Sequence, residues 1–139
     1  MSFLIDTNVV SESTKPRPNP GMVAWLAGVE EESAFLSVIT LTELRYGVER
    51  LAPGRRRKQL DRWLQHDLPL RFEGRILPID PLVADACGKL VARTESIGRP
   101  IEVREAFIAA TAQVHRLTLV TRNTSHFETT VKCILTPWT

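Results

Sequence analysis

The stretch Phe3-Leu4-Ile5-Asp6-Thr7-Asn8 decides the fold of this chain. Three consecutive apolar residues, followed by an Asp and two small polar residues, predict a short strand that is buried on both faces. Such strands are typical of parallel sheets, in which ligand-binding groups gather beyond the carboxyl ends of the strands. Asp6 would stand at that edge. It is equally suited to capping the helix that follows, so its role depends on which other carboxylates reach the same edge.

Strand and helix patterns alternate along the rest of the chain. Further short strands are predicted at residues 34–38, 76–80, 117–121 and 134–135. Helices are predicted at residues 9–13, 20–29, 40–51, 55–70, 81–97 and 101–114. Strands that alternate with helices form parallel sheets with helices on both faces. Because no repeat or long linker divides the chain, we expect one α/β domain spanning residues 1–139.

The composition argues against several functional classes. The chain has 18 Lys and Arg residues against 16 Asp and Glu, and its net charge of +2 tolerates an anionic partner without demonstrating one. Cys87 and Cys133 lie far apart in apolar contexts, which predicts reduced core residues. The histidines have no metal-ligand spacing, which argues against a zinc site. No apolar run is long enough to span a membrane and no leader peptide precedes the first strand, so we expect a cytoplasmic protein.

Acidic residues recur at the same predicted edge of the sheet. Glu43 follows the second strand, although Thr40-Leu41-Thr42-Glu43 is also typical of a capping box. Glu102 and Glu105 lie three residues apart in the first turns of the last long helix, where the helix dipole favours acidic residues in any case. Asn123 follows the fourth strand, a position typical of a turn as well as of a site.

The residue types at this edge suggest a chemistry. Carboxylates that converge repel one another unless a proton or a cation compensates their charge. Oxygen ligands without histidine or thiolate suit Mg²⁺ or Mn²⁺. Such ions activate water and neutralise the charge of a phosphodiester during in-line displacement. A metal-dependent nuclease is therefore the activity that these residues favour.

The same residues carry a resemblance to a known family. The chain resembles the PIN-domain ribonucleases, specifically the VapC-type toxins of bacterial type II toxin–antitoxin systems in their FitB-like branch. The resemblance implies a three-layer α/β/α fold with a central parallel sheet, and an endoribonuclease in which water activated by carboxylate-bound Mg²⁺ or Mn²⁺ hydrolyses RNA phosphodiester bonds. The matching runs span nearly the whole chain in order: LIDTNVVSE at 4–12, LSVITLTELRYGV at 36–48, GRILPID at 74–80, FIAATA at 107–112, LVTRN at 119–123 and Pro137-Trp138.

The resemblance also implies roles for individual residues. Asp6 and Glu43 match the family's first two acids, and Glu105 stands where the third acid is usually an Asp. These three are the implied metal ligands. Asn123 occupies the fourth catalytic position, where an amide would position water or phosphate. Supporting roles are implied for Thr7, Thr121, Glu102 and Arg122.

The implied partners follow from the same resemblance. Family members pair with a small antitoxin whose tail fills the acidic site and whose DNA-binding domain represses the shared operon. We therefore expect RNA as substrate, a cognate VapB- or FitA-like antitoxin, and operator DNA contacted only through that antitoxin. A toxin homodimer, assembled as dimers of toxin–antitoxin heterodimers in the complex, is also expected. Trp25 is a candidate for the dimer surface.

Two other functions stay open on the sequence alone. One is a catalytically weakened PIN-like protein that binds RNA or an antitoxin, because Glu105 is one methylene longer than an Asp. The other is a phosphotransfer enzyme or receiver domain that uses Asp6 as phosphoacceptor. Against the second, the Asp-Thr-Asn run lacks the second Asp of the common phosphatase motif.

Several basic residues and one histidine remain to be interpreted. Arg45 and Arg122 neighbour proposed site residues and are the better candidates for phosphate contacts. The run Arg55-Arg56-Arg57-Lys58 is more typical of a solvated helix start than of a guide for RNA. His126 could approach the active edge of the sheet, but a simple surface loop role is the favoured interpretation.

Overall fold

The chain folds around a parallel sheet with β1 at its centre. The computed structural model describes residues 1–139. The strand order is β3-β2-β1-β4-β5, and every neighbouring pair is parallel. In register, Phe3 of β1 pairs with Ala34 of β2 and with Thr118 of β4. The strands are β1 (Phe3–Ile5), β2 (Ala34–Ser37), β3 (Ile76–Leu77), β4 (Thr118–Val120) and β5 (Ile134–Leu135).

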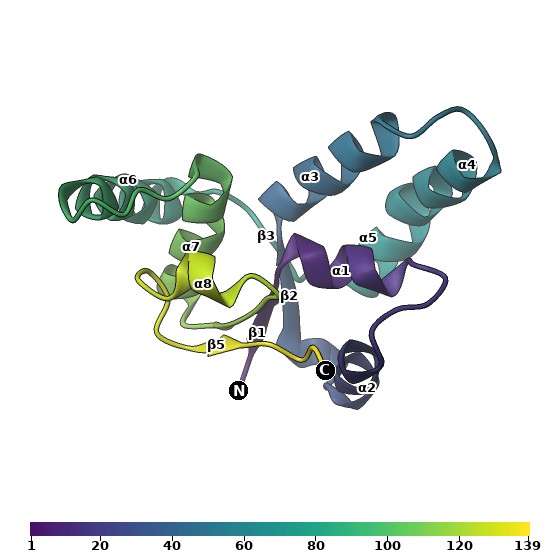
Figure 1. The fold of residues 1–139 in the computed structure, drawn as a ribbon, viewed down its shortest axis with the longest axis horizontal. Coiled ribbons are helices and arrows are strands. Elements are labelled where there is room, and N and C mark those ends of the chain that lie inside the picture. Colours follow the sequence, from purple (N-terminus) through teal and green to yellow (C-terminus); the bar gives the residue numbers. More distant parts are fainter.

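Helices cover both faces of this sheet (Figure 1), which confirms the expected α/β class with a central parallel sheet. One face carries α6 (Pro81–Ser96), α7 (Val103–His115) and α8 (Thr124–Phe127). The other carries α1 (Thr7–Ser13), α2 (Pro20–Gly28), α3 (Val38–Glu49), α4 (Arg55–Arg62) and α5 (Leu68–Arg71), with a 3₁₀ turn at Glu31–Ser33 and a π-helical turn at Trp63–Asp67. None of these helices combines the length and the apolar character that crossing a membrane requires.

Successive residues of the central strands point into different cores. Leu4 and Leu119 belong to the core beneath α6 and α7, whereas their neighbours Ile5 and Val120 belong to the core on the other face. All four side chains are at most 1% exposed. A strand that is buried on both faces needs consecutive apolar residues. This is why β1 and β4 appear in the sequence as unbroken apolar runs.

α3 begins earlier than the sequence suggested. Its N-cap is Ser37, whose Oγ accepts a hydrogen bond from the backbone N–H of Ile39 at 3.0 Å. The predicted capping box is therefore wrong, because Thr40 is fully buried in the first turn and Glu43 lies in the second turn. The pairing of β2 with β3 stops at Ser37, so a good capping residue is available as soon as the strand ends.

β3 is shorter than predicted, ending at Leu77 instead of Asp80. Pro78 has no N–H to donate to the sheet, so the ladder stops there. Asp80 caps α6, and its Oδ1 accepts a hydrogen bond from the backbone N–H of Val83 at 2.9 Å. The chain therefore turns directly from a short edge strand into a long helix.

The helix predicted over residues 55–70 is not regular throughout. A π-helical turn at Trp63–Asp67 separates α4 from α5, and the backbone N–H of Leu68 donates to the carbonyl of Trp63. Pro69 follows at once. Its ring crowds the preceding turn and it has no N–H, so the widened turn accommodates a residue that a regular α-helix disfavours.

The packing corrects one expectation about apolar residues. Cys87 is buried as predicted, but Cys133 is exposed, because it precedes the edge strand β5 that has a neighbour on one side only. Trp25 is half-buried, and its ring meets that of Phe3 edge-on at a centroid distance of 5.1 Å. Much of its apolar surface therefore packs within this chain.

Leu119→Ala is expected to destabilise the fold strongly. Leu119 is 0% exposed in the central part of the sheet, and such truncations cost about 2–5 kcal/mol because a cavity remains. Urea unfolding followed by circular dichroism measures the loss. Leu82→Ala is the matched control, since Leu82 is 70% exposed and surface changes usually stay within about 0.5 kcal/mol. Similar effects for both variants would contradict the assignment of the core.

Candidate active site

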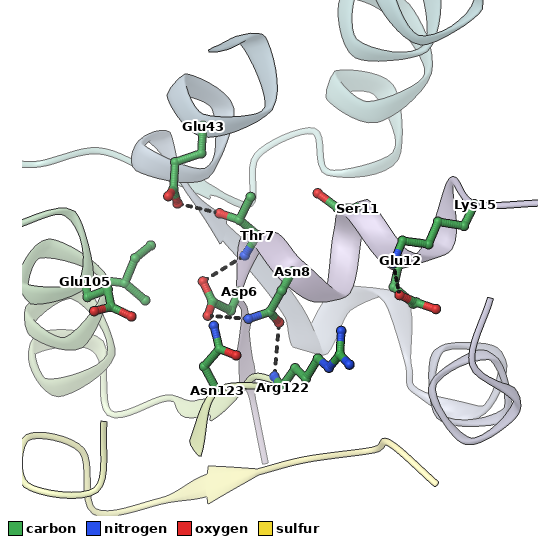
Figure 2. A pocket seen from close by; sticks show the side chains of 11 residues that line it. Asp6, Thr7, Asn8, Ser11, Glu12, Lys15, Glu43, Glu105, Arg122 and Asn123 are labelled. Atoms are coloured by element: carbon green, nitrogen blue, oxygen red, sulfur yellow. Dashed lines mark hydrogen bonds and ion pairs between the residues drawn. The ribbon is translucent and has the colours of Figure 1, made fainter. Parts of the chain in front are cut away.

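A pocket of about 330 Å³ lies at the carboxyl ends of the central strands (Figure 2). Asp6 follows β1, Glu43 comes from α3, Glu105 from α7, and Asn123 precedes α8. The structure thus brings together all four residues that the sequence suggested as catalytic. The complete lining is Asp6, Thr7, Asn8, Ser11, Glu12, Lys15, Glu43, Glu105, Ile108, Arg122 and Asn123.

Asp6 is a buried acid of the pocket, with an exposed fraction of 7%. Its Oδ1 accepts a hydrogen bond from the backbone N–H of Thr7 at 2.8 Å. Its Oδ2 accepts one from the hydroxyl of Thr121 at 2.8 Å and one from the side-chain amide of Asn8 at 3.2 Å. Asp6 is also the N-cap of α1. The two interpretations of this residue are therefore compatible, because it caps a helix and lines the pocket.

Burial raises the pKa of Asp6 from its ordinary value of 3.8 to about 6. Lost hydration is the largest cause, and the hydrogen bonds from Thr121 and Thr7 oppose it. The negative charges of Glu43 and Glu105 add to the rise. These two glutamates are thus near enough to disfavour the ionised form of Asp6, and a cation among the three acids would relieve the repulsion.

Thr7 connects the first two acids. Its backbone N–H binds Asp6, and its hydroxyl donates to Oε1 of Glu43 at 2.7 Å. The same hydroxyl oxygen lies 3.1 Å from Oγ1 of Thr40, which is buried at the start of α3. Oε2 of Glu43 has no hydrogen-bond partner within the protein. Thr7 therefore binds one oxygen of Glu43 and leaves the other available.

Thr121 and Asn8 hold the loop after β4 against the start of α1. Oγ1 of Thr121 donates to Asp6 and accepts from the backbone N–H of Asn123 at 3.0 Å. The amide of Asn8 also donates to Oγ1 of Thr121 at 3.2 Å, and its Oδ1 accepts from the backbone N–H of Arg122 at 3.0 Å. Sequence reasoning assigned Asn8 no role. Two of its partners, Thr121 and Arg122, lie more than a hundred residues away, so no local pattern could have shown these contacts.

The carboxylate of Glu105 has one hydrogen-bond partner, which is His126. Nδ1 of His126 lies 2.7 Å from Oε2 of Glu105. The surface loop role expected for His126 is therefore wrong. The single helical turn of α8 brings this side chain back toward α7, and a helix of four residues leaves no periodic signal in the sequence.

Two residues proposed from the sequence lie outside the pocket. Glu102 is the N-cap of α7, which begins at Val103, and its carboxylate accepts from the backbone N–H groups of Arg104 and Glu105 at 3.1 and 3.3 Å. The supporting role suggested for Glu102 is corrected accordingly. Arg45 is not free for phosphate either, because its guanidinium pairs with Asp61 at 2.7 Å.

The opposite end of the pocket carries basic groups. Arg122 lines it, has no carboxylate partner within hydrogen-bond range, and lies 5.8 Å from the ring centroid of Trp138. Lys15 pairs with Glu12 at 2.8 Å. That contact and the backbone N–H of Asn19 hold the pKa of Glu12 below its ordinary value. Glu12 and Lys15 were not identified from the sequence.

The basic run of α4 is used in part for internal contacts. Arg56 donates to the carbonyl of Thr14 at 2.6 Å, and Arg57 pairs with Glu49 at 2.7 Å. None of the four residues of this run lines the pocket. These contacts agree with the interpretation of this run as a solvated helix start rather than as a guide for RNA.

The donor set of the pocket suits a hard divalent cation. Asp6, Glu43 and Glu105 each keep an oxygen with at most one hydrogen bond in the protein. As they stand, no three acidic, histidine or cysteine side chains converge on a point that a metal ion would occupy. Mg²⁺ usually binds through one or two carboxylates and keeps several waters. The residues present therefore fit such an ion, provided that water completes its coordination.

Known proteins resemble this chain in both sequence and fold. The PIN domain family matches residues 3–132. Toxin FitB of Neisseria gonorrhoeae is 39% identical over 136 residues, which cover 98% of this chain and 98% of that protein. The VapC ribonuclease Y4jK of Sinorhizobium fredii is 35% identical over 98% of this chain and 97% of its own. The chain therefore belongs to the PIN-domain family.

Within that family the chain is similar to FitB- and VapC-type toxins, as the sequence resemblance predicted. A crystal structure of FitAcB from Neisseria gonorrhoeae superposes with a TM-score of 0.92 at 39% identity, covering 98% of both chains. A DNA-bound VapBC structure from Salmonella typhimurium has a TM-score of 0.79 at 24% identity and covers 99% of this chain and 98% of its own, which shows the shared fold.

Asp6→Asn is expected to stabilise the protein at neutral pH. The pKa of Asp6 rises from 3.8 to about 6 on folding. The folded state therefore binds the extra proton, and the free energy of unfolding falls as the pH rises through this window. Above it the ionised carboxylate costs about 3 kcal/mol. Urea unfolding is expected to show the variant more stable by about 1–3 kcal/mol near pH 7.5 and to show a smaller difference near pH 4.

Asp80→Asn is the matched control for this measurement. Asp80 also caps a helix, and Asn caps about as well as Asp, so little change is expected at either pH. An equal gain in both variants, or a gain for Asp6→Asn that does not depend on pH, would contradict the raised pKa.

Proposed function

We propose that this chain is the endoribonuclease toxin of a cytoplasmic toxin–antitoxin system, which hydrolyses RNA phosphodiester bonds with the help of Mg²⁺ or Mn²⁺. The observation that carries the proposal is a single pocket lined by Asp6, Glu43, Glu105 and Asn123, which come from four separate segments of the chain. Oxygen donors of this kind are typical of metal-assisted phosphodiester hydrolysis. The ribonuclease named among the relatives supports the same class.

In this proposal Asp6, Glu43 and Glu105 hold the cation. Each presents an oxygen to the pocket, and the charges of the two glutamates already raise the pKa of Asp6. When bound, a cation of this type stabilises the charge that develops on a phosphodiester and increases the acidity of water. The three acids supply a combined negative charge that offsets that of the ion.

Other residues of the pocket prepare the reaction. The hydrogen bonds from Thr121 and Thr7 lower the pKa of Asp6 against the effect of burial, which favours the ionised form at neutral pH. Asn123 is held through its backbone N–H on Thr121 and offers a neutral amide that would position the phosphate or a water. Arg122 offers a guanidinium without a carboxylate partner, a group suited to phosphate oxygens.

The proposed partner is a small VapB- or FitA-like antitoxin that neutralises the toxin. The support comes from the similar structures, one of which is FitAcB and another FitAB bound to a DNA fragment. Contact with operator DNA would then pass through the antitoxin. A toxin homodimer, within dimers of toxin–antitoxin heterodimers, belongs to the same proposal.

A second candidate is a weakened PIN-like protein that binds RNA or its antitoxin without efficient cleavage. It is favoured by the separation of the acids, no three of which converge on one point. Glu105→Asp distinguishes the two functions. A large gain of RNA cleavage in this variant would favour the weakened protein, whereas equal or lower cleavage would favour a site adapted to glutamate.

Discrete cleavage of RNA is expected from the purified protein when it is freed of antitoxin. Total RNA incubated with Mg²⁺ or Mn²⁺ should give defined fragments, and EDTA should abolish them, because the acids need a cation to act. Asp6→Asn, which we expect to fold, serves as the control for contaminating nuclease and should lose at least about 100-fold in rate. Fragments that persist in this variant or in EDTA would contradict the proposal.

Arg122→Gln is expected to weaken RNA binding more than it slows the chemical step. Figure 2 shows the guanidinium on the Glu12 side of the pocket rather than among Asp6, Glu43 and Glu105. Its loss should therefore raise KM about 10-fold and change kcat less. Steady-state cleavage of a defined RNA oligonucleotide measures both. Arg55→Gln, on α4 and outside the pocket, is the matched control. A fall in kcat with an unchanged KM would rule out a role in phosphate binding.

A further inference from the structure

Glu105 accepts its hydrogen bond from a residue that is not part of the pocket lining. Its Oε2 lies 2.7 Å from Nδ1 of His126, and His126 does not line the pocket. An ionised carboxylate can only accept hydrogen bonds, so the contact with such a carboxylate requires the tautomer of His126 in which Nδ1 carries the proton. The side chains are 27% and 53% exposed. At such exposure the Coulomb attraction is weak, and the consequence of the contact is mainly geometric.

The imidazole of His126 is presented by a firmly anchored turn. The next residue, Phe127, is 1% exposed and belongs to the core beneath α6 and α7. The backbone N–H of His126 donates to the carbonyl of Asn123 at 3.1 Å, which closes the turn of α8. Beyond the turn, Gln113 of α7 donates to the carbonyl of Thr130 at 2.9 Å. His126 therefore stands on backbone that the core and α7 hold in place.

The carboxylate of Glu105 is held by fewer hydrogen bonds than that of Asp6. Asp6 is fixed by three hydrogen bonds, whereas Glu43 has one bond, from the hydroxyl of Thr7, and Glu105 has one, to His126. A glutamate carboxylate is separated from its backbone by three rotatable bonds, so without a partner it samples several rotamers. The bond to His126 uses Oε2 and leaves Oε1 without a hydrogen bond. This is the same arrangement that Thr7 gives Glu43.

We propose that His126 is a positioning residue that orients Glu105 as a metal ligand and thereby raises the affinity of the pocket for a divalent cation. The inference rests on the proposed metal-dependent function and adds to it a residue outside the pocket. Hydrogen bonds that orient metal ligands typically change metal affinity 10- to 100-fold when they are removed. In this proposal the site requires a glutamate at position 105, because its side chain is one methylene longer than that of an aspartate and so brings the carboxylate to His126.

The test is Mn²⁺ binding to the metal-free protein, measured by isothermal titration calorimetry. His126→Ala is expected to weaken binding about 10-fold, with little change in the melting temperature of the metal-free protein. His126→Asn places an amide N–H near the position of Nδ1 and should restore most of the affinity. His66→Ala is the matched control, since His66 is exposed on the π-helical turn and makes no hydrogen bond. It should bind Mn²⁺ as the unaltered protein does.

A double-substitution cycle tests whether the effect passes through Glu105. The shorter side chain in Glu105→Asp cannot reach His126, so adding His126→Ala to that variant should change Mn²⁺ affinity little further. Unchanged binding in His126→Ala, or an equal loss with and without Glu105→Asp, would overturn the inference while Mn²⁺ binding by the unaltered protein still supports the proposed function. No Mn²⁺ binding by the unaltered protein would overturn both.

Discussion

The burial of the Asp6 carboxylate at the end of the central strand is the constraint on which the rest of the structure depends. β1 is covered on both faces, so the residue that follows it leaves the strand inside the protein and loses most of its hydration. A carboxylate in that position needs several donors. The fold provides them from both sides: Thr7 and Asn8 at the start of α1, and Thr121 at the end of β4.

The parallel sheet explains why acids from distant segments meet. Each strand of such a sheet delivers its following residues to the same edge, so Glu43 after β2 and Asn123 after β4 approach Asp6 without any local sequence signal. Glu105 arrives separately, from the first turn of α7, which packs on the face opposite to α3. Gathering these charges disfavours the ionised form of Asp6. Stability and the proposed function therefore make opposing demands on this edge, and a cation among these acids would relieve the repulsion.

The sequence predicted the parts of this arrangement that rest on local patterns. Apolar runs such as Leu4-Ile5 located the strands, and the acids that follow them located the pocket. The start of α3 was misplaced because Ser37 and Thr40 are both good caps, and the choice between them depends on where β2 stops pairing with β3. The contact of His126 with Glu105 was missed because it depends on how Phe127 anchors a single turn in the core.

Thr121, which directly follows β4, illustrates how a residue at the end of a strand becomes part of a site. Its β-branched side chain suits the end of β4, and by that criterion a valine would serve as well. The hydroxyl is what distinguishes it, because in a fully buried position it donates to Asp6 and accepts from Asn8 and Asn123. A buried hydroxyl with three partners cannot be exchanged for a methyl group without leaving donors unpaired. The hydrogen bond to Asp6 therefore requires a hydroxyl at position 121. Strand propensity alone would allow either a threonine or a valine there.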